Sequence, residues 1–204
     1  MIRVTVEKSA LRAIVQFAAD KDEIRYYLIG VLLEADKDSI RLVATNSHML
    51  GALRLPYADG DQRTDTLTEA IIPAEFIRAI KKPGRREPVA VTVELNGDTV
   101  TLRDGEATRT AKLIDGKFPA WRTIMPRGPL SGKVAQFNTA YLGTFTDARR
   151  ELGEGLPFAT VAHNGNGAAL VSIGRDDFVG VLIPTRADAP PDAAPAWAMP
   201  IGEK

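Results

Sequence analysis

The residues that could carry out chemistry are few in this chain and poorly placed for catalysis. Ser47 and His48 are adjacent, which does not bring a serine hydroxyl to its base in a useful geometry. The sequence contains neither a Gly-x-Ser-x-Gly elbow nor a phosphate-binding glycine loop. The second histidine, His163, is far from the first, and the chain has no cysteine. We therefore predict that the protein is not an enzyme and holds neither a metal ion nor a cofactor.

Basic residues form the other group with chemical potential. Arg78, Lys81, Lys82, Arg85 and Arg86 gather around the end of one predicted helix, where they could contact phosphate groups. The whole chain has 26 basic and 26 acidic residues, so its formal net charge is zero. A protein that wraps nucleic acid by charge alone would be basic, so DNA contact here would depend on uneven placement of charge. The alternative is a solvated helix face whose cations complement the helix dipole.

Composition limits the class of protein. The 204 residues suffice for one large domain or two small ones, and 45% of them are hydrophobic, which allows a packed core. No apolar run reaches the roughly 18 residues that a membrane-spanning helix needs. The first residues alternate like a strand and show no signal-peptide pattern. These features predict a cytoplasmic protein.

Three amphipathic segments predict an internal repeat. Apolar residues recur at helical spacing over 9–19, 73–82 and 140–152, and the segments begin about 65 residues apart. Each segment is followed by alternating or apolar stretches typical of strands, and Asn96-Gly97-Asp98 is typical of a hairpin turn. The predicted strands cover residues 26–33, 40–44, 89–95, 100–102, 158–161, 169–173 and 179–183.

A combination of short motifs relates the chain to a known family. The segment 113–121, Leu-Ile-Asp-Gly-Lys-Phe-Pro-Ala-Trp, cannot continue as a central strand, because Pro119 has no amide to donate. Upstream stand Arg-Tyr-Tyr-Leu at 25–28 and Val-Ala-Thr-Asn-Ser-His at 43–48, and Met-Pro stands at 199–200. In this order and at these separations, the chain resembles a shortened bacterial DNA polymerase III β sliding clamp.

The resemblance implies an α+β fold, the DNA-clamp or processivity fold, made of three βαβββ half-domain repeats. In this family the helices line the inside of a ring and the sheets form its outside. Residues 1–127 resemble the complete middle domain, with repeat units at about 1–67 and 68–127, and residues 128–204 resemble the second half of the last domain. A ring of twelve units would need four such chains, either as a simple cyclic homotetramer or as a dimer of dimers, and another number of chains stays possible.

In the family, polymerases and other partners insert a short linear motif into an apolar pocket between the middle and last domains. The resemblance places in its wall Leu28, Thr45, Ser47, His48, Leu50, Pro119, Ile124, Trp197, Met199 and Pro200. Asn46, Ser47, Met49 and Thr123 depart from the family pattern, and Met49 replaces an arginine of the pocket rim. These departures predict a partner motif that differs from the one the host's own clamp binds.

The resemblance also implies a processivity factor that encircles duplex DNA without reading its sequence and tethers polymerase. The residues expected to face DNA are Lys8, Arg12, Arg78, Lys81, Lys82, Arg149 and Arg150. The implied partners are double-stranded DNA, DNA polymerase, the clamp loader and further copies of the chain, with no membrane and no cofactor. The alternative is a clamp-like adaptor or antagonist that binds polymerase, loader or host clamp without encircling DNA.

Overall fold

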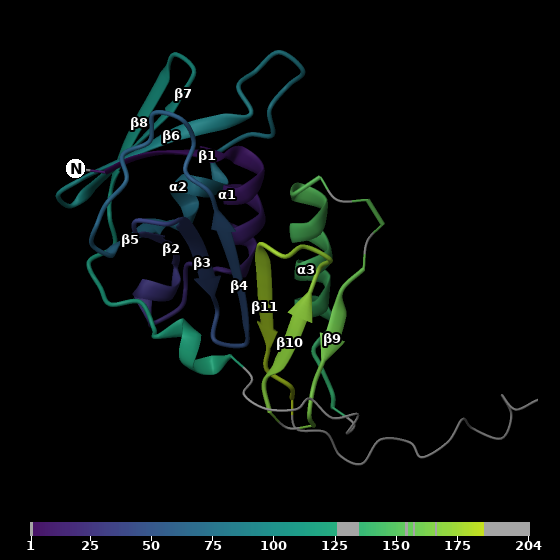
Figure 1. Ribbon diagram of the computed structural model, residues 1–204. Coiled ribbons are helices and arrows are strands. Elements are labelled where there is room, and N and C mark those ends of the chain that lie inside the picture. The colour runs from purple at the N-terminus through teal and green to yellow at the C-terminus, as the bar shows by residue number, and fades with distance from the viewer. Residues whose placement is uncertain (1, 126–134, 154, 157, 166, 186–204) are drawn as a thin grey trace, which may run out of the picture.

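The computed structural model describes residues 2–125, 135–153, 155–156, 158–165 and 167–185 (Figure 1). They form two antiparallel sheets, with helices packed against them, and confirm the predicted α+β class. We name three consecutive groups of elements units 1, 2 and 3. Unit 1 consists of β1 (Ile2–Glu7), α1 (Lys8–Ile14), β2 (Gly30–Ala35), β3 (Ile40–Thr45) and β4 (Met49–Leu55), with short 3-10 helices η1 (Val15–Phe17) and η2 (Tyr26–Leu28).

Units 2 and 3 follow the same order of elements. Unit 2 consists of β5 (Thr68–Pro73), α2 (Ala74–Arg78), β6 (Ala90–Asn96), β7 (Thr99–Asp104) and β8 (Ala107–Lys112), and the 3-10 helix η3 (Trp121–Ile124) comes after it. Unit 3 consists of α3 (Thr139–Glu151), β9 (Thr160–Ala162), β10 (Ala169–Ser172) and β11 (Phe178–Leu182). In place of a first strand, unit 3 has a single antiparallel bridge between Gln136 and Thr185 in its described residues.

Units 1 and 2 exchange their first strands. The β1 strand pairs with β6 of unit 2, and β5 pairs with β2 of unit 1, both antiparallel. Each of these strands runs directly into its own helix, α1 or α2, with no connecting loop. The four-stranded sheet therefore has the order β1-β6-β7-β8, and the seven-stranded sheet has the order β5-β2-β3-β4-β11-β10-β9. Because the exchange is reciprocal, neither sheet is complete without the other unit.

Unit 3 joins unit 1 through the β4–β11 pair, which we call the seam (Figure 1). Two glycines, Gly51 and Gly180, stand opposite each other in the seam. A Cβ at Gly51 would lie 2.6 Å from the ring of Phe17, and one at Gly180 would lie 2.3 Å from the ring of Phe145. The two buried rings pack edge to face, with centroids 4.9 Å apart. The glycines thus make room for aromatic packing between η1, which continues α1, and α3 on one face of the sheet.

Some predicted boundaries were wrong for local reasons. The second helix was predicted over 73–82, but α2 ends at Arg78 and its last turn tightens, since the Ile80 amide donates to Ile77 O at 2.8 Å. Pro83 follows closely and disfavours helical geometry in the residue before it. Residues 26–28, predicted as strand, form η2. The first helix continues beyond Ile14 only as the 3-10 turn η1.

The paired glycines generate a stability prediction. Gly180→Ala should lower the free energy of unfolding by about 1–3 kcal/mol, because the added methyl group overpacks the Phe145 ring. Gly143→Ala on α3 is the matched control: its Cβ meets nothing within 4 Å, and alanine favours helix over glycine. Urea denaturation should therefore move the two midpoints in opposite directions. A Gly180→Ala midpoint equal to that of the wild type would contradict the role given to the glycine pair.

Candidate functional site

A cavity of about 260 Å³ lies over the seam. Its wall comes from four parts of the chain: the η2 turn, the β3–β4 turn, the segment 119–124 that includes η3, and the end of β11. Most of its side chains are apolar, and among the polar ones Arg25, Ser47 and Thr123 are exposed, whereas Thr45 is buried. The lining residues are Arg25, Tyr27, Leu28, Thr45, Ser47, Met49, Leu50, Pro119, Ala120, Trp121, Thr123, Ile124, Val181 and Ile183.

The structure brings together six of the residues expected in a pocket wall: Leu28, Thr45, Ser47, Leu50, Pro119 and Ile124. His48 is corrected, because it is exposed, does not line the cavity and stacks on Tyr141 of α3 with ring centroids 5.6 Å apart. The β3–β4 turn causes this orientation, since the Asn46 side chain accepts from the His48 and Met49 amides at 3.0 Å. Trp197, Met199 and Pro200 lie outside the described residues.

The base of the cavity is apolar and closely packed. Leu28 and Leu50 are 2% and 1% exposed. Val181 stands opposite Leu50 in the β4–β11 ladder, and the Ile183 amide donates to His48 O at 2.9 Å. The two halves of the cavity are therefore joined by backbone hydrogen bonds across the seam. Such a preformed apolar surface can accept apolar side chains without first ordering itself.

The rim carries one cation and a strained turn. Arg25 donates from Nη2 to Ser47 Oγ at 2.9 Å and pairs with Glu23 at 2.8 Å. Its hydrogen bonds lower the pKa of Glu23 to about 2. Ser47 has φ 70°, a left-handed conformation that costs energy in a residue with a side chain. Met49 contributes an apolar surface where the family pattern has an arginine. The positive charge at this edge belongs to Arg25 instead.

Sequence reasoning named Met49 and Thr123 only as departures from the family pattern, and it missed Arg25, Tyr27, Ala120, Trp121, Val181 and Ile183 as parts of the wall. The β11 residues reach the cavity only because β11 pairs with β4, more than 100 residues earlier in the chain. Hydrophobic alternation marks both strands but does not say which strand pairs with which. For Tyr27 the available signal was its position inside the motif at 25–28, next to the predicted wall residue Leu28.

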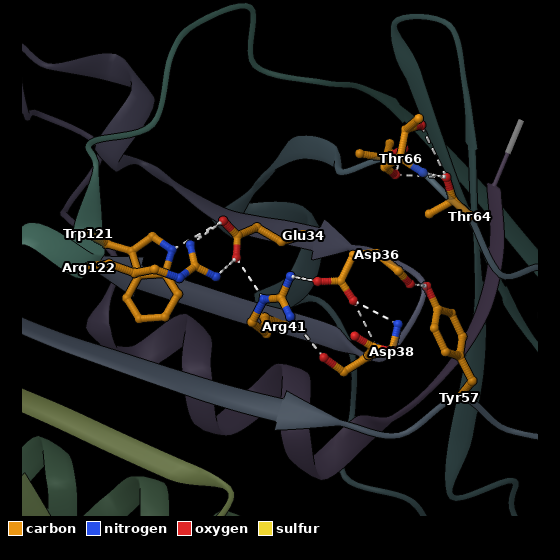
Figure 2. Close-up of polar contacts among 11 residues, drawn as sticks. Glu34, Asp36, Asp38, Arg41, Tyr57, Thr64, Thr66, Trp121 and Arg122 are labelled. Atoms are coloured by element: carbon orange, nitrogen blue, oxygen red, sulfur yellow. Dashed lines mark hydrogen bonds and ion pairs between the residues drawn. The ribbon is translucent and has the colours of Figure 1, made fainter.

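A buried carboxylate holds η3 against the sheet (Figure 2). Glu34 on β2 is 1% exposed and accepts two hydrogen bonds from Arg122, at 2.9 and 2.8 Å. It also accepts from Arg41 Nε at 2.9 Å and from Trp121 Nε1 at 3.3 Å. The Arg122 guanidinium lies over the Trp121 ring, 4.1 Å from its centroid. One carboxylate thus orients the first two residues of η3, of which Trp121 lines the cavity.

Neighbouring groups keep this carboxylate ionised. Burial raises the pKa of Glu34, but the hydrogen bonds from Arg122 and Arg41 outweigh it, so the pKa is lowered. Arg41 also pairs with Asp36 at 2.6 Å, and its hydrogen bond, together with the backbone amides of Asp38 and Ser39, lowers the pKa of Asp36 to about 2 (Figure 2). The network therefore carries its full ion pairing at neutral pH and loses it only in acid.

Two of the residues expected to face DNA are buried, and the expectation is corrected for them. Lys8 is 2% exposed, with Nζ 2.7 Å from Asp104 Oδ1 on β7. Arg149 is 7% exposed, donates to Leu156 O at 2.7 Å and to Ile173 O, and lies over the Phe158 ring. Helical position alone suggested an outward direction for both. A carboxylate for Lys8, and carbonyls with a ring for Arg149, turn them inward.

The other expected cations lie on the helix side of the seven-stranded sheet. Arg12 donates to Glu151 with two bonds of 2.9 Å and to Ile80 O at 2.9 Å, so it links all three units. Arg78 and Arg150 line a shallow groove beside Arg12, between α1 and α3. Lys81 and Lys82 are exposed in the turn after α2. Among the described residues, the exposed cations of this set are thus Arg78, Lys81, Lys82 and Arg150.

The fold is that of a clamp-type chain. Residues 5–120 match the family model for the DNA polymerase III beta subunit, central domain, and the chain belongs to this family. A beta sliding clamp of Pseudomonas aeruginosa is 31% identical over 130 residues, which are 62% of this chain and 35% of the relative. The beta sliding clamp of Escherichia coli K12 is 25% identical over 131 residues, which are 63% of this chain and 35% of the relative. The chain matches about a third of the length of these curated relatives.

Solved structures share the fold over more of the chain. The crystal structure of the DNA polymerase III subunit beta from Pseudomonas aeruginosa has a TM-score of 0.71 at 22% identity, covering 92% of this chain and 67% of that one. A beta sliding clamp from C. crescentus gives the same TM-score at 19% identity, covering 91% and 65%. These likenesses confirm the predicted clamp fold. None of the helices in the described residues has the length and apolar character to cross a membrane.

The Glu34 network generates the second prediction. Glu34→Gln should lower the free energy of unfolding by about 3 kcal/mol at pH 7, because it removes the charge of a buried carboxylate that pairs with Arg41, which is largely buried, and with Arg122, which is half exposed. The wild-type contribution is present above the ordinary carboxyl pKa and is lost as the pH falls through the lowered folded pKa. Denaturant titrations at a series of pH values should therefore show the two proteins converging in acid.

Glu94→Gln is the control for this prediction, since Glu94 forms a surface ion pair with Arg103 on a neighbouring strand. Its loss should change stability much less, because exposed pairs are screened by solvent. A gap between wild type and Glu34→Gln that stays constant from neutral to acid pH would show that the carboxylate does not act through its charge.

Proposed function

We propose that the protein is a DNA sliding clamp, a processivity factor that encircles duplex DNA as a ring of its own copies. Through the seam cavity it tethers DNA polymerase, the clamp loader and other partners by short linear motifs. The protein acts as a non-enzymatic scaffold in the cytoplasm, at the nucleoid. The observation that carries the proposal is the preformed apolar cavity at the junction of two units, in a chain of the DNA polymerase III beta subunit family.

The cavity suits an extended peptide with apolar anchors. Apolar side chains form its base, while backbone and hydroxyl groups at its edge can orient a peptide chain. Arg25 at the rim favours an acidic group next to the anchors. Met49 is an adaptable side chain that can contact anchors of different shape. We therefore assign the pocket role to the described wall residues, and the same role to Trp197, Met199 and Pro200 stays a prediction.

Contact with DNA would depend on the exposed cations beside α1, α2 and α3. Arg78, Lys81, Lys82 and Arg150 can meet phosphates without reading bases. Three units per chain make a homotetramer the arrangement that supplies the twelve units of a family ring, with residues 1–127 as the complete domain and 128–204 as the half domain. The role of the ring is topological, because a tethered polymerase stays at high local concentration near the primer end.

A clamp-like adaptor or antagonist that does not encircle DNA is the second candidate. It is favoured by the burial of Lys8 and Arg149, which removes two of the cations that would attract phosphates. Such a protein would use the cavity to bind polymerase, loader or the host clamp. The two candidates differ in topology, so a DNA-circle experiment separates them.

The topology experiment loads the protein on closed circular DNA and then linearises the circle. We expect retention on the circle and release after the cut, because a ring slides off a free end. Replacing Arg78, Lys81 and Lys82 by glutamate should reduce retention at least about tenfold, since the reversed charges repel phosphates. Glutamate at Arg103, a cation on β7 of the other sheet, is the control. Binding that is indifferent to the cut would overturn encirclement and favour the adaptor.

The cavity is tested by a binding titration. Ile124 is 40% exposed in the cavity wall, so Ile124→Asp should leave the fold intact while placing a charge where apolar anchors would pack. We expect affinity for a labelled peptide carrying the polymerase's clamp-binding motif to fall at least about tenfold, or roughly 1.4 kcal/mol. Val89→Asp changes an exposed valine outside the cavity and serves as control. Equal affinities for both variants and the wild type would place the peptide site elsewhere.

A further inference from the structure

The strand exchange between units 1 and 2 follows one register. Glu7, just before α1, pairs with Ala90, the first residue of β6. Pro73, just before α2, pairs with Gly30, the first residue of β2. In both cases the last residue of the donated strand meets the first residue of the accepting strand. Two independent pairs within one chain therefore define how a unit of this fold completes its sheet.

Unit 3 places its own lead-in segment where a donated strand would begin. In unit 2, the chain returns after β8 and the Ile114 amide donates to Ile71 O at 2.9 Å, three residues before α2. In unit 3, the chain returns after β11 and the Thr185 amide donates to Gln136 O at 2.8 Å, three residues before α3. Gln136 is thus the counterpart of Ile71. Residues 135–138 lie in the position of the end of β5.

The accepting edge of unit 3 is open in the described part of the chain. There β9 pairs with β10 alone, whereas β2 and β6 each pair with a second strand from the sister unit. All of β2 is buried, but Thr160 at the start of β9 is exposed. Phe158 and Leu156 just before it are 46% and 78% exposed. An open strand edge beside exposed apolar side chains favours pairing with another chain.

We propose that two copies of this chain complete each other by exchanging residues 135–138 across a two-fold axis. Each copy gives this segment to β9 of the other, and the internal register places Asn138 opposite Thr160 and Gln136 opposite Ala162. A second copy is the occupant that fits, because unit 3 offers a donor and an acceptor together. A single added peptide strand would cover only the acceptor, while a two-fold exchange satisfies both.

Only the role of the exchange in a ring rests on the proposed function. In such a ring the exchange would form one of the contacts between chains, and other strand edges would form the rest. The exchange favours the dimer-of-dimers arrangement over a simple cyclic ring. The contact itself is measurable without DNA or polymerase.

The experiment mixes two single-cysteine variants, Gln136→Cys and Ala162→Cys, under oxidised glutathione. The chain has no cysteine, so no background cross-link arises. The Ile71 carbonyl accepts from the Ile114 amide and so points away from β2, which makes Ile71 and Leu32 a non-hydrogen-bonded pair. The corresponding pair in the proposed exchange, Gln136 and Ala162, should therefore have Cα atoms about 4.5 Å apart. That separation lies within the range of a disulfide. We expect a covalent dimer on a non-reducing gel that disappears with reductant. Because each variant carries a single cysteine, any disulfide must join two different chains.

Thr160→Cys mixed with Gln136→Cys is the matched control. It places the second thiol two residues away on the same strand, about 7–8 Å from its partner on the diagonal, which is beyond disulfide reach. Absence of a dimer in the first mixture, or equal dimer in both, would overturn the exchange.

A further variant tests the exchange without a covalent cross-link. Val161 is the counterpart of Val31, whose amide faces β5. Val161→Pro should therefore remove a backbone hydrogen-bond donor from the open edge of β9 and leave the pairing of β9 with β10 in place. The concentration for half-dimerisation should rise at least about tenfold in sedimentation, with an unchanged thermal midpoint for the dilute monomer. Unchanged self-association in this variant would overturn the proposal. Failure of DNA retention with intact cross-linking would instead count against the clamp function alone.

Discussion

The structure depends on strands that pair outside their own unit. Because β1 and β5 run into their helices without a loop, neither can fold back onto the strands that follow, and each completes the sheet of the other unit. Units 1 and 2 share their larger hydrophobic core, which continues into unit 3, and a second, smaller cluster around Leu32, Leu50 and Trp121 also draws on all three units. The same constraint leaves unit 3 with an open strand edge in its described residues, and this edge is the observation on which the proposed pairing of two copies rests.

The cavity depends indirectly on this strand pairing. Its base is the seam, where β4 and β11 pair, and its outer wall is η3, which Glu34 holds through Arg122 and Trp121. A carboxylate on a buried strand is costly unless it is paired, and here two arginines and an indole satisfy it. The wall is therefore ordered during folding, so the free-energy cost of ordering it would not reduce the affinity for the proposed peptide.

Local periodicity in the sequence predicted the repeat and most helices, and the resemblance to a known family implied the α+β class, which the structure confirms. Sequence reasoning failed where the deciding contact is remote. Lys8 begins an amphipathic helix and was assigned to its polar face, but its partner Asp104 lies on β7, far away in the chain. Arg149 was assigned outward for the same reason, although carbonyls of Leu156 and Ile173 bind it.

The cavity shows the same division between local and remote information. Leu28, Leu50 and Pro119 stand in motifs that could be recognised, whereas Val181 enters the wall only through the β4–β11 ladder. His48 stood in a recognised motif too, yet the turn geometry at Asn46 directs it away from the cavity. Motifs thus identified six residues that line the cavity, whereas local turn geometry decided the direction of His48 and strand pairing decided the position of Val181.

The mass of the particle in solution tests the central claim most directly, namely that copies of this chain complete one another. Light scattering over a range of micromolar concentrations should give a mass of at least two chains, rising toward four where a ring closes. The single chain has a mass of 22.1 kDa. A particle that stays at 22.1 kDa throughout that range would contradict the account.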